Sequence, residues 1–179
     1  MGWFRRLLDY FTPSESSSTL KNGEITLSNL SNVQSCSHSQ PYIILDTETT
    51  GLDAQEDAII QLSAIKYGCD GKAIDCFSTY LNPGRNIPSS ITHLTGITNQ
   101  MVAKAPTANQ IEQDFFSFIG TSLIVGYNTR FDLRFLQYTF ENTFHRCNYV
   151  DVLQITRQLF DLPNYKLETV STSIGFNPS

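Results

Sequence analysis

Long apolar runs, closely spaced cysteines and an excess of basic residues are all missing from this sequence of 179 residues. No stretch approaches the ~20 consecutive apolar residues of a membrane-spanning helix, and the start of the chain lacks a signal-peptide cleavage site. The four cysteines show no C-x-x-C spacing, which argues against a zinc site or a disulfide framework. The net charge of −5 argues against a protein that coats nucleic acid with a basic surface. We therefore expect a cytoplasmic protein without a transmembrane segment.

The composition divides the chain into two unequal parts. Residues 1–40 comprise an N-terminal amphipathic segment, in which Trp3, Leu7 and Phe11 share one helical face, and a linker rich in serine and asparagine. The amphipathic segment could be a helix that docks on a protein partner or a membrane surface, or simply a frayed turn with aromatic side chains. Residues 41–179 have the apolar content of one folded α/β domain.

Hydrophobic periodicity predicts strands followed by alternating helices and strands. Asp70-Gly71 makes a short connection that predicts an antiparallel hairpin, and Thr107 with Gln110 forms a capping-box pattern at the start of a helix. We predict strands at 42–48, 57–68, 72–84 and 122–128, and helices at 87–98, 105–120, 129–142, 150–160 and 166–175. This order is typical of an α/β fold with a mixed sheet flanked by helices.

The segment IILDTETTGLD, residues 43–53, places two acids at the end of a buried strand. Because side chains alternate along a strand, Asp46 and Glu48 point to the same face. Two like charges side by side repel each other unless a cation lies between them, and carboxylate oxygens suit Mg²⁺ or Mn²⁺. The pattern therefore indicates a metal site, although a solvated strand end followed by an ordinary turn explains these residues equally well.

A third acid follows the predicted strand 122–128. The segment GYNTRFD places Asn128 just after this strand and Asp132 early in the next helix. Asp132 could join the two acids of the first strand in one metal cluster. Alternatively, it could be an acid favoured at a helix N-terminus by the helix dipole.

Taken in order, several segments resemble the DEDD, or DnaQ-like, superfamily of 3′–5′ exonucleases. They are ILDTETTGLD, LNPG, LTGIT, APT, GYNTRFD, VDVLQITR and NYKLETV, and they run from about Tyr42 to Phe176. The resemblance is strongest to the proofreading exonuclease of bacterial DNA polymerase III, its epsilon subunit or exonuclease domain. The second family motif usually reads G-H-N-x-x-F-D, whereas Tyr127 holds the position of the histidine in this sequence. The resemblance implies a ribonuclease H-like mixed sheet whose first three strands are antiparallel.

The same resemblance implies the site residues and the reaction. Asp46, Glu48 and Asp132 would be the catalytic carboxylates and the ligands of two Mg²⁺ or Mn²⁺ ions, with Asp46 bridging both. Nucleoside 5′-monophosphates would be removed from the 3′ end of a single-stranded nucleic acid, with DNA favoured over RNA. The residues expected to contact the terminal nucleotide are Thr47, Thr49, Gly51, Leu52, Asn128 and Phe131.

The third family motif, His-x-x-x-x-Asp, has no counterpart after NYKLETVSTSIGF, where the sequence reads GFNPS. Its histidine would be the general base and its aspartate the fourth metal ligand. Asp151 and Asp161 are weak candidates to replace the missing carboxylate. We therefore expect a C-terminally truncated exonuclease domain with impaired activity. Two alternatives stay open: an RNA-trimming exonuclease, and a catalytically dead module that binds nucleic acid or a partner.

Overall fold

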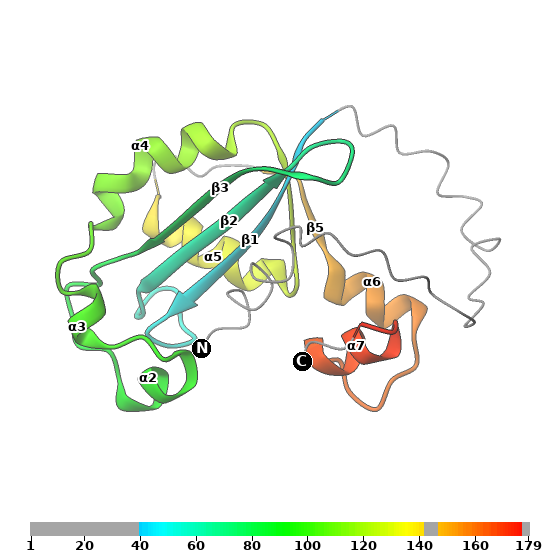
Figure 1. The fold of residues 1–179 in the computed structure, drawn as a ribbon. Coiled ribbons are helices and arrows are strands. Elements are labelled where there is room, and N and C mark those ends of the chain that lie inside the picture. The colour runs from blue at the N-terminus through cyan, green and yellow to red at the C-terminus, as the bar shows by residue number, and fades with distance from the viewer. Residues whose placement is uncertain (1–39, 142–146, 177–179) are drawn as a thin grey trace, which may run out of the picture.

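A single mixed sheet organises the chain in the computed structural model, which describes residues 40–141 and 147–176. Its strands are β1 (Tyr42–Thr49), β2 (Ile59–Tyr67), β3 (Ala73–Tyr80), β4 (Leu123–Gly126) and β5 (Tyr149–Asp151). Within the described residues they lie in the order β3-β2-β1-β4-β5 (Figure 1). The first three strands are antiparallel, and β4 and β5 run parallel to β1. The predicted α/β fold with a mixed sheet is confirmed, and β1 is its central strand.

The helices of the described residues lie on one face and at both ends of this sheet (Figure 1). They are α2 (Ser89–Thr95), α3 (Asn99–Val102), α4 (Ala108–Ile119), α5 (Thr129–Thr139), α6 (Val152–Leu159) and α7 (Leu167–Ser173). Helices α4 and α5 cover the face on which Ile43 and Leu45 are buried, and Phe115 and Phe135 fill the space between. Burial of such aromatic side chains is the main stabilising term of the domain.

Several predicted elements have different bounds in the structure. The segment 150–160 is not one helix, because Tyr149–Asp151 first pairs with β4 as a short strand and α6 then begins at Val152. Helix α3 was absent from the predicted elements, β1 extends to Thr49 rather than Glu48, and the other predicted helices and strands are shorter in the structure. Three residues of strand directly before an amphipathic helix give no period-two signal of their own, which is why the pattern extended the helix over them.

The capping and turn signals predicted from the sequence are confirmed. Thr107 and Gln110 form the predicted capping box at the start of α4, with the Thr107 N–H donating to the Gln110 side chain at 2.8 Å. Gly71 lies in the β2–β3 turn with a φ of 74°, a conformation that glycine adopts without strain. Gly175 follows α7 with a φ of 81° and ends that helix as expected.

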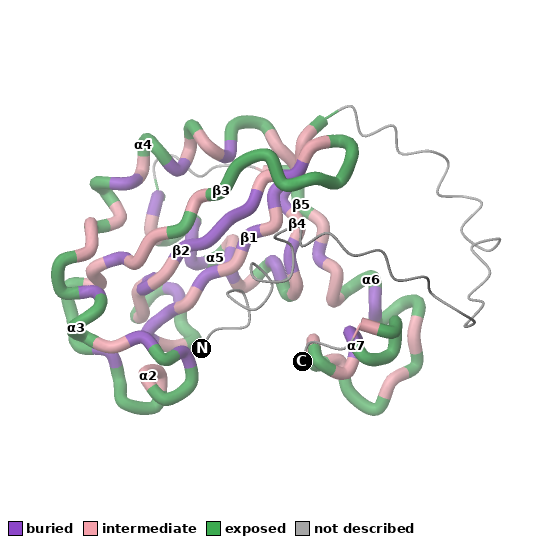
Figure 2. The backbone as a smooth tube through the Cα atoms, in the orientation of Figure 1, coloured by how far each residue is buried: buried purple, intermediate pink, exposed green. Residues whose placement is uncertain are grey.

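Residues are more buried at the centre of the sheet than at the edge formed by β3. Figure 2 shows buried residues concentrated on β1 and β2, whereas β3 at the sheet edge is largely exposed. No helix among the described residues is long and apolar enough to cross a membrane. The amphipathic segment and the linker expected at 1–40 lie outside the described residues, apart from Gln40.

Candidate active site

The strand period places the two acids of β1 as predicted. Burial alternates along β1, with Thr47 and Thr49 turned toward the core, so Asp46 and Glu48 face the opposite side of the sheet. In the antiparallel register, Asp46 lies opposite Ser63, while Glu48 lies opposite Gln61 on β2. Both acids keep part of their surface exposed, whereas Thr47 and Thr49 are buried.

Asp132 reaches β1 because β4 is too short to pair with the whole strand. The parallel register joins β4 to β1 only at Tyr42–Ile44, which leaves later N–H groups on that edge without a strand partner. The Asp132 carboxylate occupies this position: its Oδ1 accepts the Thr47 N–H at 2.9 Å and the Thr47 hydroxyl at 2.8 Å. These hydrogen bonds fix the start of α5 against β1, although Thr47 and Asp132 are 85 residues apart in sequence. Asp132 is buried, with 4% of its surface exposed.

Gly126 allows α5 to begin this close to β1. A Cβ atom at this position would lie 3.2 Å from the Leu45 carbonyl oxygen and 3.0 Å from the Thr129 hydroxyl. Both distances are shorter than ordinary van der Waals contact, so any side chain here would push the start of α5 away from the strand. Glycine at the end of β4 thus helps to bring Asp132 within hydrogen-bonding distance of Thr47.

The three carboxylates are electrostatically coupled. Burial raises the pKa of Asp132 to about 7, although the hydrogen bonds from Thr47 oppose this shift. Burial is also the largest cause that raises the pKa of Asp46 well above its ordinary value, and the charges of Asp132 and Glu48 raise it further. The pKa of Glu48 is raised by burial as well. No Lys or Arg in the described part of the chain forms an ion pair with these three acids.

The carboxylate oxygens of Asp46, Glu48 and Asp132 are the type of ligand that a hard divalent cation prefers, and their negative charge would attract it. As the side chains stand, however, residues 40–141 and 147–176 contain no group of three or more His, Cys, Asp or Glu that could hold a metal ion. One oxygen of Asp132 is committed to Thr47 by the two hydrogen bonds described above. The assignment of Asp46, Glu48 and Asp132 as metal ligands therefore stays a prediction that rests on their coupling and their donor type.

Asp151, a weak candidate for the missing carboxylate, instead supports the junction between β4 and α5. Asn128 has a left-handed backbone, with a φ of 61°, and its N–H donates to Asp151 Oδ1 at 3.0 Å. The same oxygen accepts the Leu153 N–H at 3.1 Å and caps α6. Asp151 therefore holds the backbone of the junction in place. The hydrogen bonds that it accepts give it a structural role.

The residues expected to contact substrate fall into two groups. Thr47 and Thr49 are buried, and their hydroxyls bond to Asp132 and to the Gly51 carbonyl, so they offer little more than backbone to a ligand. Leu52 is 82% exposed and lies in the loop that follows β1. The second motif contributes Asn128, which is exposed, and Phe131, which packs on Phe135 with ring centres 5.0 Å apart.

Tyr127 connects the second motif to the segment before α7. Its hydroxyl donates to the Tyr165 carbonyl oxygen at 2.5 Å, and the Arg157 guanidinium lies over the Tyr165 ring at 5.7 Å. Burial raises the pKa of the Tyr127 hydroxyl, so it stays protonated and remains a donor at neutral pH. The tyrosine that departs from the usual family motif thus makes a long-range contact of its own.

Replacing Tyr127 with Phe should loosen this connection. The ring is kept while a part-buried carbonyl loses its donor, so the free energy of unfolding should fall by about 1 kcal/mol in urea titrations. Tyr138→Phe is the matched control, because its hydroxyl takes part in an exposed hydrogen bond and its removal should change stability by less than about 0.5 kcal/mol. Equal effects of the two variants would contradict a structural role for the Tyr127 hydroxyl.

Comparison with known proteins identifies relatives for almost the whole described domain. The profile of a family described as Exonuclease matches residues 43–178. The PolC-type DNA polymerase III of Clostridium perfringens is 35% identical over 144 residues, which are 79% of this chain and 10% of that protein. The PolC-type DNA polymerase III of Bacillus subtilis is 35% identical over 136 residues, or 73% of this chain and 9% of the relative. The chain thus spans about a tenth of the length of these curated relatives.

Solved structures of exonuclease I share the fold. A complex titled "ExoI/SSB-Ct complex" superimposes with a TM-score of 0.69 at 20% identity, covering 79% of this chain and 37% of that one. Escherichia coli Exonuclease I in complex with a 5cy-dA13 oligonucleotide gives a TM-score of 0.67 at 20% identity, with 76% and 36% covered. At this level of identity the likeness establishes the fold alone. The expected ribonuclease H-like fold is confirmed.

Proposed function

Because the chain belongs to the exonuclease family, we propose that it removes nucleoside 5′-monophosphates from the 3′ end of single-stranded DNA in a reaction that depends on divalent metal. The observation that carries the proposal is the approach of Asp132 to β1, where it is coupled to Asp46 and Glu48. A buried carboxylate beside two partly exposed ones, with their pKa values raised, is typical of a site that binds a cation or moves a proton.

Asp46, Glu48 and Asp132 would hold Mg²⁺ or Mn²⁺ at the open end of β1. Such ions supply Lewis-acid stabilisation of the charge that develops on the phosphate. The chain's own contribution is to fix the ligands, since the Thr47 N–H and hydroxyl orient Asp132 before any metal arrives. Preorganised ligands need not be rearranged at the moment of reaction, and this favours rapid hydrolysis.

The substrate would lie against the loop that follows β1 and the start of α5. Leu52 is exposed enough to wedge beside the terminal base. The backbone at Thr49 and Gly51 would lie against the terminal nucleotide. Asn128 and Phe131 would shape the other side of the nucleotide pocket. DNA is favoured over RNA because the matched relatives are named DNA polymerases, which also favours a role in replication within the cytoplasm.

A second candidate function has one observation in its favour. Residues 1–179 contain no His-x-x-x-x-Asp, so they supply neither the general base nor the fourth acid of the family. Loss of a general base lowers rates by about 10²–10⁴-fold. The residues present would then act as a slow enzyme, or as a module that binds nucleic acid without cutting it.

The test compares two proteins on single-stranded DNA labelled at its 3′ end. One is the chain of 179 residues, and the other is the same chain followed by a segment that carries His-x-x-x-x-Asp. We expect the extended protein to release labelled mononucleotide at least ~100-fold faster in Mg²⁺ or Mn²⁺ than the shorter one. Asp46→Ala should silence it.

Three outcomes would contradict the proposed function, and a fourth, brisk digestion by the shorter chain, would contradict only the expected impairment. Release of the label within longer fragments would indicate an endonuclease, and preference for an RNA of the same sequence would indicate RNA trimming. Brisk, Asp46-dependent digestion by the shorter chain would show that another residue supplies the base. DNA binding by both proteins without any hydrolysis would favour the non-catalytic module.

A further inference from the structure

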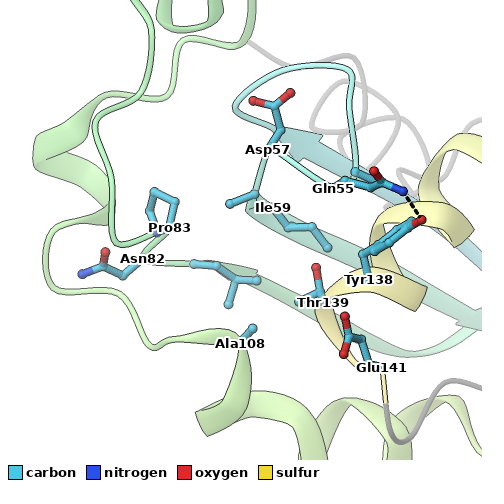
Figure 3. Close-up of a pocket in the computed structure, with 12 residues that line it drawn as sticks. Gln55, Asp57, Ile59, Asn82, Pro83, Ala108, Tyr138, Thr139 and Glu141 are labelled. Atoms are coloured by element: carbon cyan, nitrogen blue, oxygen red, sulfur yellow. Dashed lines mark hydrogen bonds between the residues drawn. The ribbon is translucent and has the colours of Figure 1, made fainter.

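The loop Thr50–Ala58 between β1 and β2 has little packing beneath it. A cavity of about 280 Å³ lies between this loop, the end of β3 and the last turn of α5 (Figure 3). Ala54 is the one loop residue that enters the hydrophobic core, and it contributes only a methyl group. Hydrogen bonds rather than apolar contacts must therefore hold much of the loop in its conformation.

Several of the polar groups that line this cavity already hydrogen-bond within the protein. Asn82 donates to the Ala103 carbonyl at 3.2 Å and accepts the Gly84 N–H at 2.9 Å. Gln55 donates to the Tyr138 hydroxyl at 2.6 Å, as the dashed line in Figure 3 marks. Such a lining offers few unused groups to a ligand, so the cavity explains the loop's lack of support better than it suggests a binding site.

Asp57 connects the start of the loop to its end through hydrogen bonds of its carboxylate and its backbone. Its Oδ1 accepts the Thr50 hydroxyl at 3.0 Å, its Oδ2 accepts the Asp53 N–H at 3.0 Å, and its own N–H donates to the Asp53 carbonyl at 2.7 Å. Thr50 in turn accepts the Ala58 N–H at 3.0 Å, which closes the base of the loop. In Figure 3 the Asp57 carboxylate points away from the cavity and toward the loop.

Gly51 shows how closely the loop is built around this carboxylate. A Cβ atom at Gly51 would lie 2.3 Å from Asp57 Oδ2 and 2.5 Å from Oδ1, well inside contact distance. Only a residue without a side chain allows Asp57 to reach Thr50 and Asp53 at the same time. The glycine of the first motif and Asp57 therefore form one structural unit.

We propose that Asp57 is a positioning residue that fixes the loop receiving the terminal nucleotide. The inference rests on the proposed function, because it takes Gly51 and Leu52 as the surface on which the 3′ end lies. Both residues directly precede Asp53, whose N–H donates to the Asp57 carboxylate. Loss of this hydrogen bond would therefore free the backbone at Gly51 and Leu52. Asp57 thus acts through the loop and needs no contact with DNA.

The first measurement follows the loop without any DNA. In hydrogen exchange monitored by NMR, Asp57→Ala should lose protection at the amides of Thr50, Asp53 and Ala58, while the core strands keep theirs. Asp114→Ala is the matched control, since Asp114 is exposed on α4, and it should leave every amide unchanged. Unaltered protection of the loop in Asp57→Ala would overturn the proposal.

The second measurement uses a fluorescein-labelled oligothymidylate in Ca²⁺, with either a free 3′ hydroxyl or a 3′ phosphate. Wild type should prefer the free hydroxyl, and Asp57→Ala should bind that oligonucleotide about tenfold more weakly, which corresponds to about 1.4 kcal/mol. Asp57→Asn keeps an oxygen for Thr50 but cannot accept the Asp53 N–H, so its loss should be intermediate. A merely structural residue would weaken both oligonucleotides equally, and that result would overturn the proposal.

A double-mutant cycle tests the coupling to Gly51. Gly51→Ala alone should weaken binding because its methyl group displaces the Asp57 carboxylate. The double variant should bind no more weakly than Asp57→Ala, because the carboxylate that the methyl strikes is gone. Additive losses would overturn the coupling. If wild type does not prefer the free 3′ hydroxyl, the proposed function is contradicted. If wild type shows this preference and Asp57→Ala binds equally well, only the role of Asp57 is contradicted.

Discussion

The variant Asp46→Asn should melt at a higher temperature than wild type in EDTA and should gain nothing from Mn²⁺. Wild type carries coupled carboxylates at Asp46, Glu48 and Asp132 with no ion-paired cation among the described residues. Each unit by which the folded state raises a carboxyl pKa costs about 1.4 kcal/mol once the group is ionised. Removing one of the charges should relieve part of this cost, and each 1 kcal/mol relieved raises the melting temperature by about 2–4 °C in a chain of this size.

In Mn²⁺, wild type should melt at a higher temperature than Asp46→Asn. A cation that binds only the folded state stabilises it by mass action, so wild type should gain several degrees while the variant, with a ligand removed, stays where it was. Differential scanning fluorimetry of both proteins in EDTA and in Mn²⁺ gives the four values required. Asp114→Asn is the control for loss of an acid on the exposed side of α4. A variant that melts below wild type in EDTA, or that keeps the full response to Mn²⁺, would contradict the metal assignment.

In the absence of divalent cations, the free energy of unfolding should fall as the pH rises from about 5 to 8. The folded-state pKa of Asp132 is about 7, whereas an aspartate in an unfolded chain ionises near pH 3.9. Between these two values the folded state binds more protons than the unfolded state, so raising the pH favours unfolding. The difference of about three pKa units corresponds to a loss of up to ~4 kcal/mol in the free energy of unfolding. This loss is absent below about pH 4 and complete above about pH 7.

Asp132→Asn should flatten this pH profile. The asparagine can still accept both hydrogen bonds from Thr47 but carries no charge, so the variant should be the more stable protein at pH 8. Urea titrations at pH 5.5 and pH 8 measure the effect, and Mn²⁺ should restore wild-type stability at the higher pH. The charges of Asp46 and Glu48 remain in the variant and should leave a smaller slope. A wild-type profile that rises toward pH 8 would contradict the buried, uncompensated state of Asp132.

Regular patterns were sufficient to predict much of this fold. The period of two in IILDTET placed Asp46 and Glu48 on one face, and the alternating burial of β1 confirms it. The hairpin at Asp70-Gly71 and the capping box at Thr107 follow from local chemistry, which a sequence displays directly. Elements whose side chains repeat over many residues are therefore found, and only their ends are misplaced.

Contacts between distant segments could not be predicted in this way. The bonds from Thr47 to Asp132 arise because β4 ends early, and strand length is the least certain property of a pattern. Asp151 looked like a possible spare ligand until β5 placed it beneath the Asn128 N–H. Asp57 gave no signal as the support of the loop, since its partners depend on how that loop folds back.

The distance in sequence between Thr47 and Asp132 has a consequence for the order of folding. Strands β1, β2 and β3 join through short connections and can pair early, whereas Asp132 reaches Thr47 across 85 residues. Contacts of such separation carry a larger entropy of loop closure and form late on average. The three carboxylates should therefore meet only when β4 and α5 have docked. During synthesis, the acids of β1 would remain apart from Asp132, and free of its repulsion, until most of the domain had been made.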